Sequence, residues 1–287
     1  MNKNIKILVC CHKKDIMATS EPYLPIHVGK SLSDTELDIQ PDNTGENISE
    51  KNRSYCELTG MYWAWKNLKD TDIIGLCHYR RYFDFHSKGI DSHFDQILKK
   101  SSDFNHTDLS IPKGAFQQIK DGVVVVPRPW NVNESIKNLY CEKHISDDFR
   151  IMEQVIRESG DRKYIQAFWK LMYESNRQYY GNMFIMTWHD FNAYCSWVFD
   201  ILAKIEQLTD ITHYKFIQGR IYGYMSERLF NVFLIANNFK TIERPVIYFN
   251  DNARNYNHSF YDLIKYKLGC WRNNIGFNLL RPHKSHY

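Results

Sequence analysis

The chain has 287 residues and a formal net charge of +4, from 37 Lys and Arg against 33 Asp and Glu. Hydrophobic residues make up 43% of it and aromatic residues 15%. This composition excludes a disordered chain, and so small a charge argues against a nucleic-acid-binding surface. The seven Cys residues include no Cys-x-x-Cys pair, so a zinc ribbon and a thioredoxin-like site are not expected.

The first elements of the chain predict a reduced, cytoplasmic protein. The apolar run Ile7–Cys11 is too short for a signal peptide, and His12, Lys13 and Lys14 follow it at once. No apolar stretch reaches the length of about 18 residues that spans a bilayer. The Cys residues are scattered, and several lie in apolar segments, as is typical of buried thiols.

Strands and helices alternate along the chain. Residues 20–46 are predicted as loop, and residues 131–176 as mostly helical. Short apolar runs predict buried strands at Lys6–Cys11, Asp72–Cys77, Gly122–Val126, Asn182–Met186 and Pro245–Phe249. Helical spacing of apolar residues predicts further helices after Asn47 as far as Leu68, over Phe191–Leu208 and over Ser226–Asn237. This alternation predicts an α/β fold with a largely parallel sheet flanked by helices.

The helix after Asn47 carries its apolar side chains on one face. Arg53, Glu57 and Lys66 lie on the opposite face, which we expect to be solvated.

The C-terminal segment is both basic and aromatic. Residues 254–287 hold one acid, Asp262, against six cations, and so carry a local charge of +5: Arg254, Lys265, Lys267, Arg272, Arg281 and Lys284. On a helix this pattern is typical of an interfacial membrane anchor. A C-terminal helix packed on the domain with a solvated basic face is an equal alternative.

Cations follow several of the predicted strands. They include His12 and Lys13, the run His78–Arg81, and Arg128. Ligands of open α/β sheets bind beyond the carboxyl ends of the strands, and Arg suits phosphate oxygens. The pattern therefore predicts a site for an anionic ligand such as a diphosphate. A structural salt bridge is the alternative for Arg80.

Glu227 is predicted to open a helix. There it is either a carboxylate stabilised by the helix dipole or a general base.

The ordered motifs of the chain resemble a bacterial family. These are Lys6–Cys11, Tyr23–Gly29, Asp42–Asn52, Tyr55–Asn67 and the string His-Tyr-Arg-Arg-Tyr-Phe at residues 78–83. They resemble the capsular or exopolysaccharide biosynthesis glycosyltransferases long labelled a domain of unknown function. The resemblance implies one GT-A-like domain, with residues 1–130 binding a nucleotide sugar, 131–250 binding the acceptor and 251–287 forming the basic C-terminal segment.

The resemblance also implies a reaction. A hexose, galactofuranose or galactopyranose, would pass from a UDP donor to a growing, lipid-linked surface polysaccharide, with inversion. The protein would lie on the inner face of the membrane, which it would contact through its basic C-terminal segment. No Asp-x-Asp stands at its usual place, where His78–Arg81 is found instead. We therefore expect no metal cofactor, with Arg80 and Arg81 neutralising the leaving diphosphate.

By the same resemblance, roles fall on particular residues. Glu227 would be the catalytic base, and Asp190 is the next candidate. The expected donor-binding residues are Cys11, His12, Lys13, Asn47, Asn52, Tyr55, His78, Tyr79, Arg80 and Arg81. Rings at a strand exit could stack on a sugar, namely Tyr79, Tyr82 and Phe83. Two other functions stay open: a non-catalytic nucleotide-sugar or glycan-binding protein, and a nucleotidyl or phosphoryl transferase.

Overall fold

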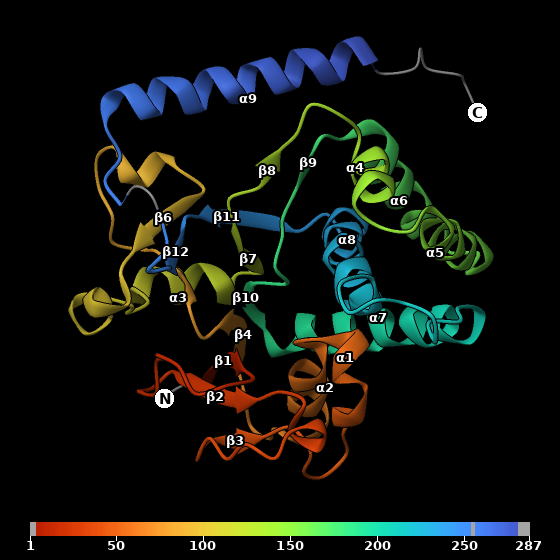
Figure 1. Cartoon of the computed structure of the whole chain (residues 1–287), viewed down its shortest axis with the longest axis horizontal. Helices are drawn as coiled ribbons and strands as arrows, with labels where there is room; N and C mark the ends of the chain where they lie inside the picture. Colours follow the sequence, from red (N-terminus) through yellow and green to blue (C-terminus); the bar gives the residue numbers. More distant parts are fainter. Residues whose placement is uncertain (1–3, 254–255, 281–287) are drawn as a thin grey trace.

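A computed structural model describes residues 4–253 and 256–280 (Figure 1). Within them, ten strands form one sheet. Its main path runs in the order β11 (Lys240–Arg244), β7 (Val123–Pro127), β10 (Phe184–Thr187), β4 (Ile73–His78), β1 (Ile5–Cys11), β2 (Tyr23–His27) and β3 (Gln40–Pro41). Three more strands branch from it, β5 (Arg81–Phe83), β6 (Gln96–Lys99) and β12 (Val246–Phe249). The mostly parallel sheet flanked by helices confirms the predicted fold class.

On the main path of the sheet, strand β10 is the exception to the parallel arrangement; among the branching strands, β5 also runs antiparallel to its neighbours β4 and β12. Strand β10 runs antiparallel to β4, with Phe184 opposite Leu76, and antiparallel to β7, with Ile185 opposite Val125. The carboxyl ends of β1, β4 and β7 therefore share one edge of the sheet with the start of β10. The end of β10 lies at the other edge, contrary to the expectation that all strand exits converge.

Helices cover the sheet because its strands are apolar on both faces. Leu8 and Cys10 of β1 join the core on the face that carries most of the helices, whereas Ile7 and Val9 join the core against α3. Alternate residues of a strand point to opposite faces, so one apolar run serves both cores. The helices are α1 (Asn52–Tyr55), α2 (Leu58–Asn67), α3 (Lys113–Lys120), α4 (Ile136–Lys143), α5 (Ser146–Glu158), α6 (Arg162–Glu174), α7 (Trp188–Leu208), α8 (Ile221–Ala236) and α9 (Phe260–Leu280).

The helix predicted after Asn47 is interrupted. It consists of a 3₁₀ turn at Ser49–Lys51, then α1, then α2. Cys56 separates the two α-helices with φ of 55° and ψ of −132°. A non-glycine residue rarely adopts this conformation, and propensity gives no sign of it.

Two other boundaries differ from prediction. Strand β2 lies in the segment that was predicted as loop. The prediction of a loop there rested on residues such as Pro25, which is rare in strands. β3 pairs only with Ile26 and His27, so the outer side of β2 is unpaired at Pro25 and tolerates the missing N–H. Helix α8 begins at Ile221 and not at Ser226, so Glu227 lies in its second turn and the helix-dipole account of this residue is wrong.

Helix α9 lies across one end of the molecule, beyond β8 (Trp130–Asn131) and β9 (Arg177–Gln178) (Figure 1). Leu263 and Phe277 are buried, whereas the helix exposes Tyr261, Ile264, Leu268, Trp271 and Ile275 at intervals of three and four residues. The predicted cations Arg254, Arg281 and Lys284 lie outside the described residues. In the described part of the chain, no helix is both long and apolar enough to cross a membrane.

Candidate functional site

A cavity of about 550 Å³ opens at the edge of the sheet where β1 and β4 end. Its size falls within the range of small-molecule sites. Its walls come from strand exits, the α1–α2 junction, the start of β10, helix α8 and strand β12. The residues are Cys10, His12, Val28, Asn52, Arg53, Cys56, Glu57, His78, Tyr79, Arg80, Arg81, Gly181, Phe216, Arg220, Glu227 and Tyr248.

Four Arg residues give the cavity its positive charge, and two of them are already engaged. Arg80 donates through Nε to Asp15 Oδ1 at 2.9 Å, and Arg220 donates through Nε to Cys56 Sγ at 3.2 Å. Arg81 stacks over the ring of Tyr248 at 4.8 Å. The Arg81 side chain makes no hydrogen bond or ion pair within residues 4–253 and 256–280, so its planar fork of donors is available to phosphate oxygens.

Two carboxylates, Glu57 and Glu227, face these cations across the cavity. Glu227 Oε1 accepts the backbone N–H of Gly181 at 2.9 Å, and its Oε2 accepts from Arg228 at 2.9 Å. Glu57 Oε1 accepts from the side chain of Asn182 at 2.7 Å. Adjacent residues of one turn thus hold both carboxylates.

That turn, Gly181–Asn182, is left-handed at both positions, with φ of 74° and 51°. Its conformation lets the Gly181 N–H meet Glu227 while the Gly181 carbonyl accepts from His78 Nε2 at 2.7 Å. Ser226 donates to the Asn182 side-chain oxygen at 3.1 Å, which fixes the amide that binds Glu57. Such conformations are held only where surrounding contacts over-determine them, as at functional sites.

Burial changes the protonation of both acid–base groups beside this turn. It raises the pKa of Glu227; the Arg228 guanidinium opposes this rise and the charge of Glu57 adds to it. It lowers the pKa of His78, so the imidazole stays neutral over a wider pH range. The neutral His78 donates from Nε2 to the Gly181 carbonyl. A carboxylate with a raised pKa is suited to accept a proton near neutral pH.

Seven of the predicted site residues line the cavity. They are His12, Asn52, His78, Tyr79, Arg80, Arg81 and Glu227. Arg80 carries the structural salt bridge to Asp15 that was the alternative for it. The Asn52 side chain also spans the break between α1 and α2, donating to the Cys56 carbonyl at 2.7 Å.

Four predicted donor-binding residues lie outside the cavity wall. Cys11 is buried, and its thiol donates to the Lys13 carbonyl. The Lys13 ammonium lies over the ring of Tyr79 at 5.9 Å. Asn47 accepts from the Ser49 N–H at 3.2 Å and so orders the loop before α1. Tyr55 is buried, and its hydroxyl donates to Glu206 at 3.1 Å.

Asp190 lies at the opposite edge of the sheet. It belongs to the first turn of α7, where its N–H donates to the Thr187 hydroxyl at 3.1 Å and its carboxylate accepts from the same hydroxyl at 2.7 Å. The next residue along from Thr187, Trp188, donates its N–H to the carbonyl of Asp72, before the start of β4. The antiparallel direction of β10 thus separates Asp190 from the cavity.

Two of the rings expected to stack on a sugar are core residues. Tyr82 and Phe83 are buried beneath β12, so that expectation is wrong for both. Tyr79 remains at the cavity wall.

Sequence patterns missed several lining residues. Arg53 and Glu57 stand on the face predicted to be solvated, and the break at Cys56 makes that face a cavity wall. In the sequence, only their position on the polar side of an otherwise apolar helix could have indicated that Arg53 and Glu57 line a site. Phe216, Arg220 and Tyr248 reach the cavity through tertiary packing, which leaves no local pattern.

The described residues at the exit of β4 do not form a site for a divalent ion. His78, Tyr79, Arg80 and Arg81 occupy that place, and Arg side chains repel a cation. Across residues 4–253 and 256–280, no group of three or more His, Cys, Asp or Glu side chains could hold a metal ion.

Comparisons with known proteins show a family and a similar solved structure. The solved structure "WbbM bifunctional glycosytransferase apo structure" is similar, with a TM-score of 0.76 and 28% identity over 86% of this chain. The chain spans 46%, about half, of that protein. Among curated proteins, none matches the chain. The family model "Domain of unknown function (DUF4422)" matches residues 6–238, which include every residue of the cavity wall except Tyr248. The chain therefore belongs to the DUF4422 family.

Proposed function

We propose that this protein is a glycosyltransferase that moves a hexose from a nucleoside diphosphate sugar to a glycan. The observation that carries the proposal is the cavity at the exits of β1 and β4, where Arg side chains face two carboxylates. The fold shared with part of a bifunctional glycosyltransferase supports it. The predicted UDP donor and its galactofuranose or galactopyranose group are finer parts of the same proposal.

The Arg side chains would bind the diphosphate. Arg53, Arg81 and Arg220 line the cavity and contribute three positive charges to its wall. As the anomeric carbon–oxygen bond breaks, the leaving diphosphate gains negative charge, which guanidinium groups stabilise without a metal ion.

Glu227 would act as the base. The acceptor hydroxyl oxygen bonds to the anomeric carbon from the face opposite the diphosphate, its proton passes to the carboxylate, and the nucleoside diphosphate leaves with the electron pair of the broken bond. This displacement inverts the anomeric centre. The turn Gly181–Asn182 holds the carboxylate in place through its backbone N–H.

The cations at the exit of β4 support a metal-independent reaction. We expect activity to survive chelation by EDTA, because the described residues form no group of three or more His, Cys, Asp or Glu side chains that could hold a metal ion. The measurement is transfer of the sugar before and after EDTA treatment. Loss of activity that Mn²⁺ or Mg²⁺ restores would refute metal independence.

The acceptor is proposed to be lipid-linked, with the protein on the inner face of the bacterial membrane. The exposed stripe of α9 supports this, because Lys265, Lys267 and Arg272 flank its apolar residues. An apolar face beside cations suits a helix that lies in the surface of an anionic bilayer. The acceptor's lipid would then be held near the enzyme.

Donor binding tests the proposed function most directly. A ligand that binds only the native state raises the melting temperature. We expect UDP and UDP-hexoses to raise it, and the variant Arg81→Ala to abolish most of this rise. GDP and CMP serve as nucleotide controls. No shift with any nucleotide sugar would contradict a glycosyltransferase.

A further inference from the structure

Trp130 presents an exposed aromatic ring next to the cavity wall. Its side chain is 43% exposed, and its ring stacks on that of Tyr180 at 4.2 Å between centroids and 23° between planes. Tyr180 is 5% exposed, so the indole rests on a buried ring that cannot move aside. One face of the indole is thus covered and the rest is open to solvent.

The ring on which Trp130 stacks, Tyr180, is next in the chain to a residue of the cavity wall. Tyr180 directly precedes Gly181, whose N–H binds Glu227 and whose carbonyl accepts from His78. Burial raises the pKa of Tyr180 to about 12, and the charge of Arg81 opposes that rise. The exposed indole is therefore one packed ring away from the cavity wall.

The residue after Trp130 connects the same strand to α9. The Asn131 carbonyl accepts from Asn273 at 2.7 Å, and the Asn131 side chain donates to Asn274 at 2.9 Å. Strand β8 thus packs against α9, the helix with the exposed basic and apolar face, and lies beside it in Figure 1.

We propose that Trp130 is a binding subsite for one sugar ring of the acceptor glycan. This inference rests on the proposed function and names where its acceptor binds. The C–H face of a hexose packs on an aromatic face, while its hydroxyl groups remain in water. A ring stacked on Trp130 places the next sugar of the chain toward Glu227 and leaves the rest of the glycan running toward α9.

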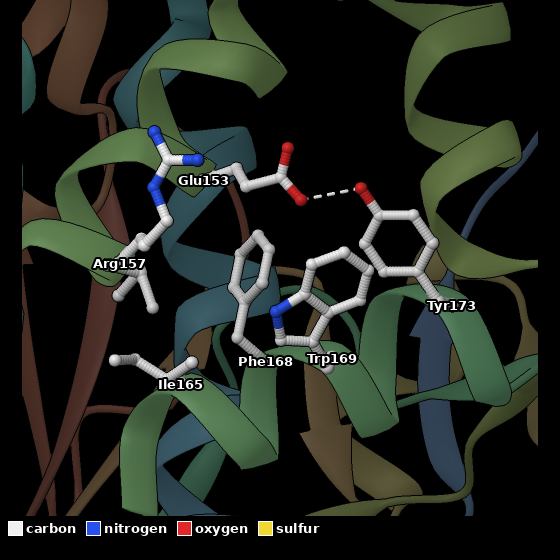
Figure 2. A pocket seen from close by; sticks show the side chains of 7 residues that line it. Glu153, Arg157, Ile165, Phe168, Trp169 and Tyr173 are labelled. Atoms are coloured by element: carbon white, nitrogen blue, oxygen red, sulfur yellow. Dashed lines mark hydrogen bonds between the residues drawn. The ribbon is translucent and has the colours of Figure 1, made fainter. Parts of the chain in front are cut away.

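The chain offers a closely matched control in Trp169 on α6 (Figure 2). Trp169 is 47% exposed and stacks on Tyr173 at 4.1 Å and 26°. It borders a separate hollow of about 170 Å³ with Glu153, Arg157 and Ile165, and shares no lining residue with the cavity. Trp130→Ala and Trp169→Ala therefore remove the same kind of contact at two different places.

The test is saturation-transfer-difference NMR of methyl β-D-galactopyranoside and methyl β-D-glucopyranoside, with UDP present. We expect signal from one face of the sugar ring, weaker by roughly three- to tenfold in Trp130→Ala, as for the loss of one aromatic contact. Trp130→Phe should keep part of the signal, and Trp169→Ala should keep all of it. Melting temperatures of the variants check that each remains folded.

Three outcomes overturn the subsite: no signal from either glycoside, signal that survives in Trp130→Ala, or signal that disappears in Trp169→Ala. UDP binding measured on the same samples separates this result from the proposed function. If UDP binds and the glycosides do not depend on Trp130, the subsite alone fails. If UDP does not bind, the proposed function fails as well.

Discussion

The two carboxylates of the cavity differ in how their oxygens are occupied. Both oxygens of Glu227 accept hydrogen bonds, from the Gly181 N–H and from Arg228. Glu57 accepts one hydrogen bond, from Asn182, at Oε1, and no donor to its Oε2 lies in the described part of the chain. Glu227 has the raised pKa that a base needs, whereas Glu57 has an oxygen available.

Replacement of Glu227 by Gln tests the assignment of the base. We expect a loss of kcat of about 10²- to 10⁴-fold, the contribution typical of general base catalysis. A base must be ionised, so kcat/KM of the wild type should rise with pH through the Glu227 pKa. Because burial raises that pKa, the acid limb should lie above the ordinary Glu value of about 4.3.

Glu153→Gln is the control, because Glu153 is a carboxylate that binds a Tyr hydroxyl in the separate hollow of Figure 2. Near-normal turnover of Glu227→Gln would remove Glu227 from the role. If only Glu57→Gln lowers kcat, and it also abolishes the acid limb of the pH profile, the base is Glu57.

The neighbouring residues Arg80 and Arg81 should contribute differently to donor binding. Arg80 is held by Asp15, whereas Arg81 stacks on Tyr248 with its donors available. A hydrogen bond to a charged group contributes about 1.5–3 kcal/mol, so Arg81→Ala should weaken UDP binding roughly 10- to 150-fold. Arg80→Ala should weaken it less. Isothermal titration calorimetry checks this order, and equal losses would show that the Asp15 pair does not restrain Arg80.

At the scale of elements, the turn before β10 should affect catalysis as well as the stability of the protein. Ala at the φ of Gly181, 74°, costs about 1–2 kcal/mol of stability. Gly160 has φ of 69° in the loop between α5 and α6, with open space around it, so Gly160→Ala should lose similar stability. Only Gly181→Ala should also lower kcat, because only that turn holds Glu227 and His78.

Thermal unfolding and steady-state kinetics measure the two effects. If both Gly variants keep full turnover, the turn does not position the carboxylate.

Local patterns predicted the elements better than the site. The runs at β1, β4 and β7 are apolar over their length because both sheet faces are covered, and such runs stand out in the sequence. The direction of β10 depends on its neighbours, and a wrong assumption about it made Asp190 a candidate. The break at Cys56 depends on tertiary contacts, so Arg53 and Glu57 could not be recognised as cavity residues.

At the scale of the whole molecule, α9 should mediate binding to anionic membranes. A cation near an anionic surface contributes about 1 kcal/mol, so Lys265→Ala with Lys267→Ala should weaken binding roughly 30-fold. Sedimentation with phosphatidylglycerol vesicles measures it. The control removes two exposed cations from other helices, Arg150 on α5 and Lys204 on α7. Equal loss in both variants would assign binding to net charge and not to α9.

The interleaved order of the sheet determines when the proposed site is complete during synthesis. Strand β10 inserts between β4 and β7, and β12 adds Tyr248 to the cavity wall. On the ribosome, a nascent chain that ends before β12 holds all four Arg residues of the cavity but lacks Tyr248 from its wall. We therefore expect the proposed binding of a nucleotide sugar only once translation has passed Tyr248. Incomplete chains would neither consume donor nor modify the glycan.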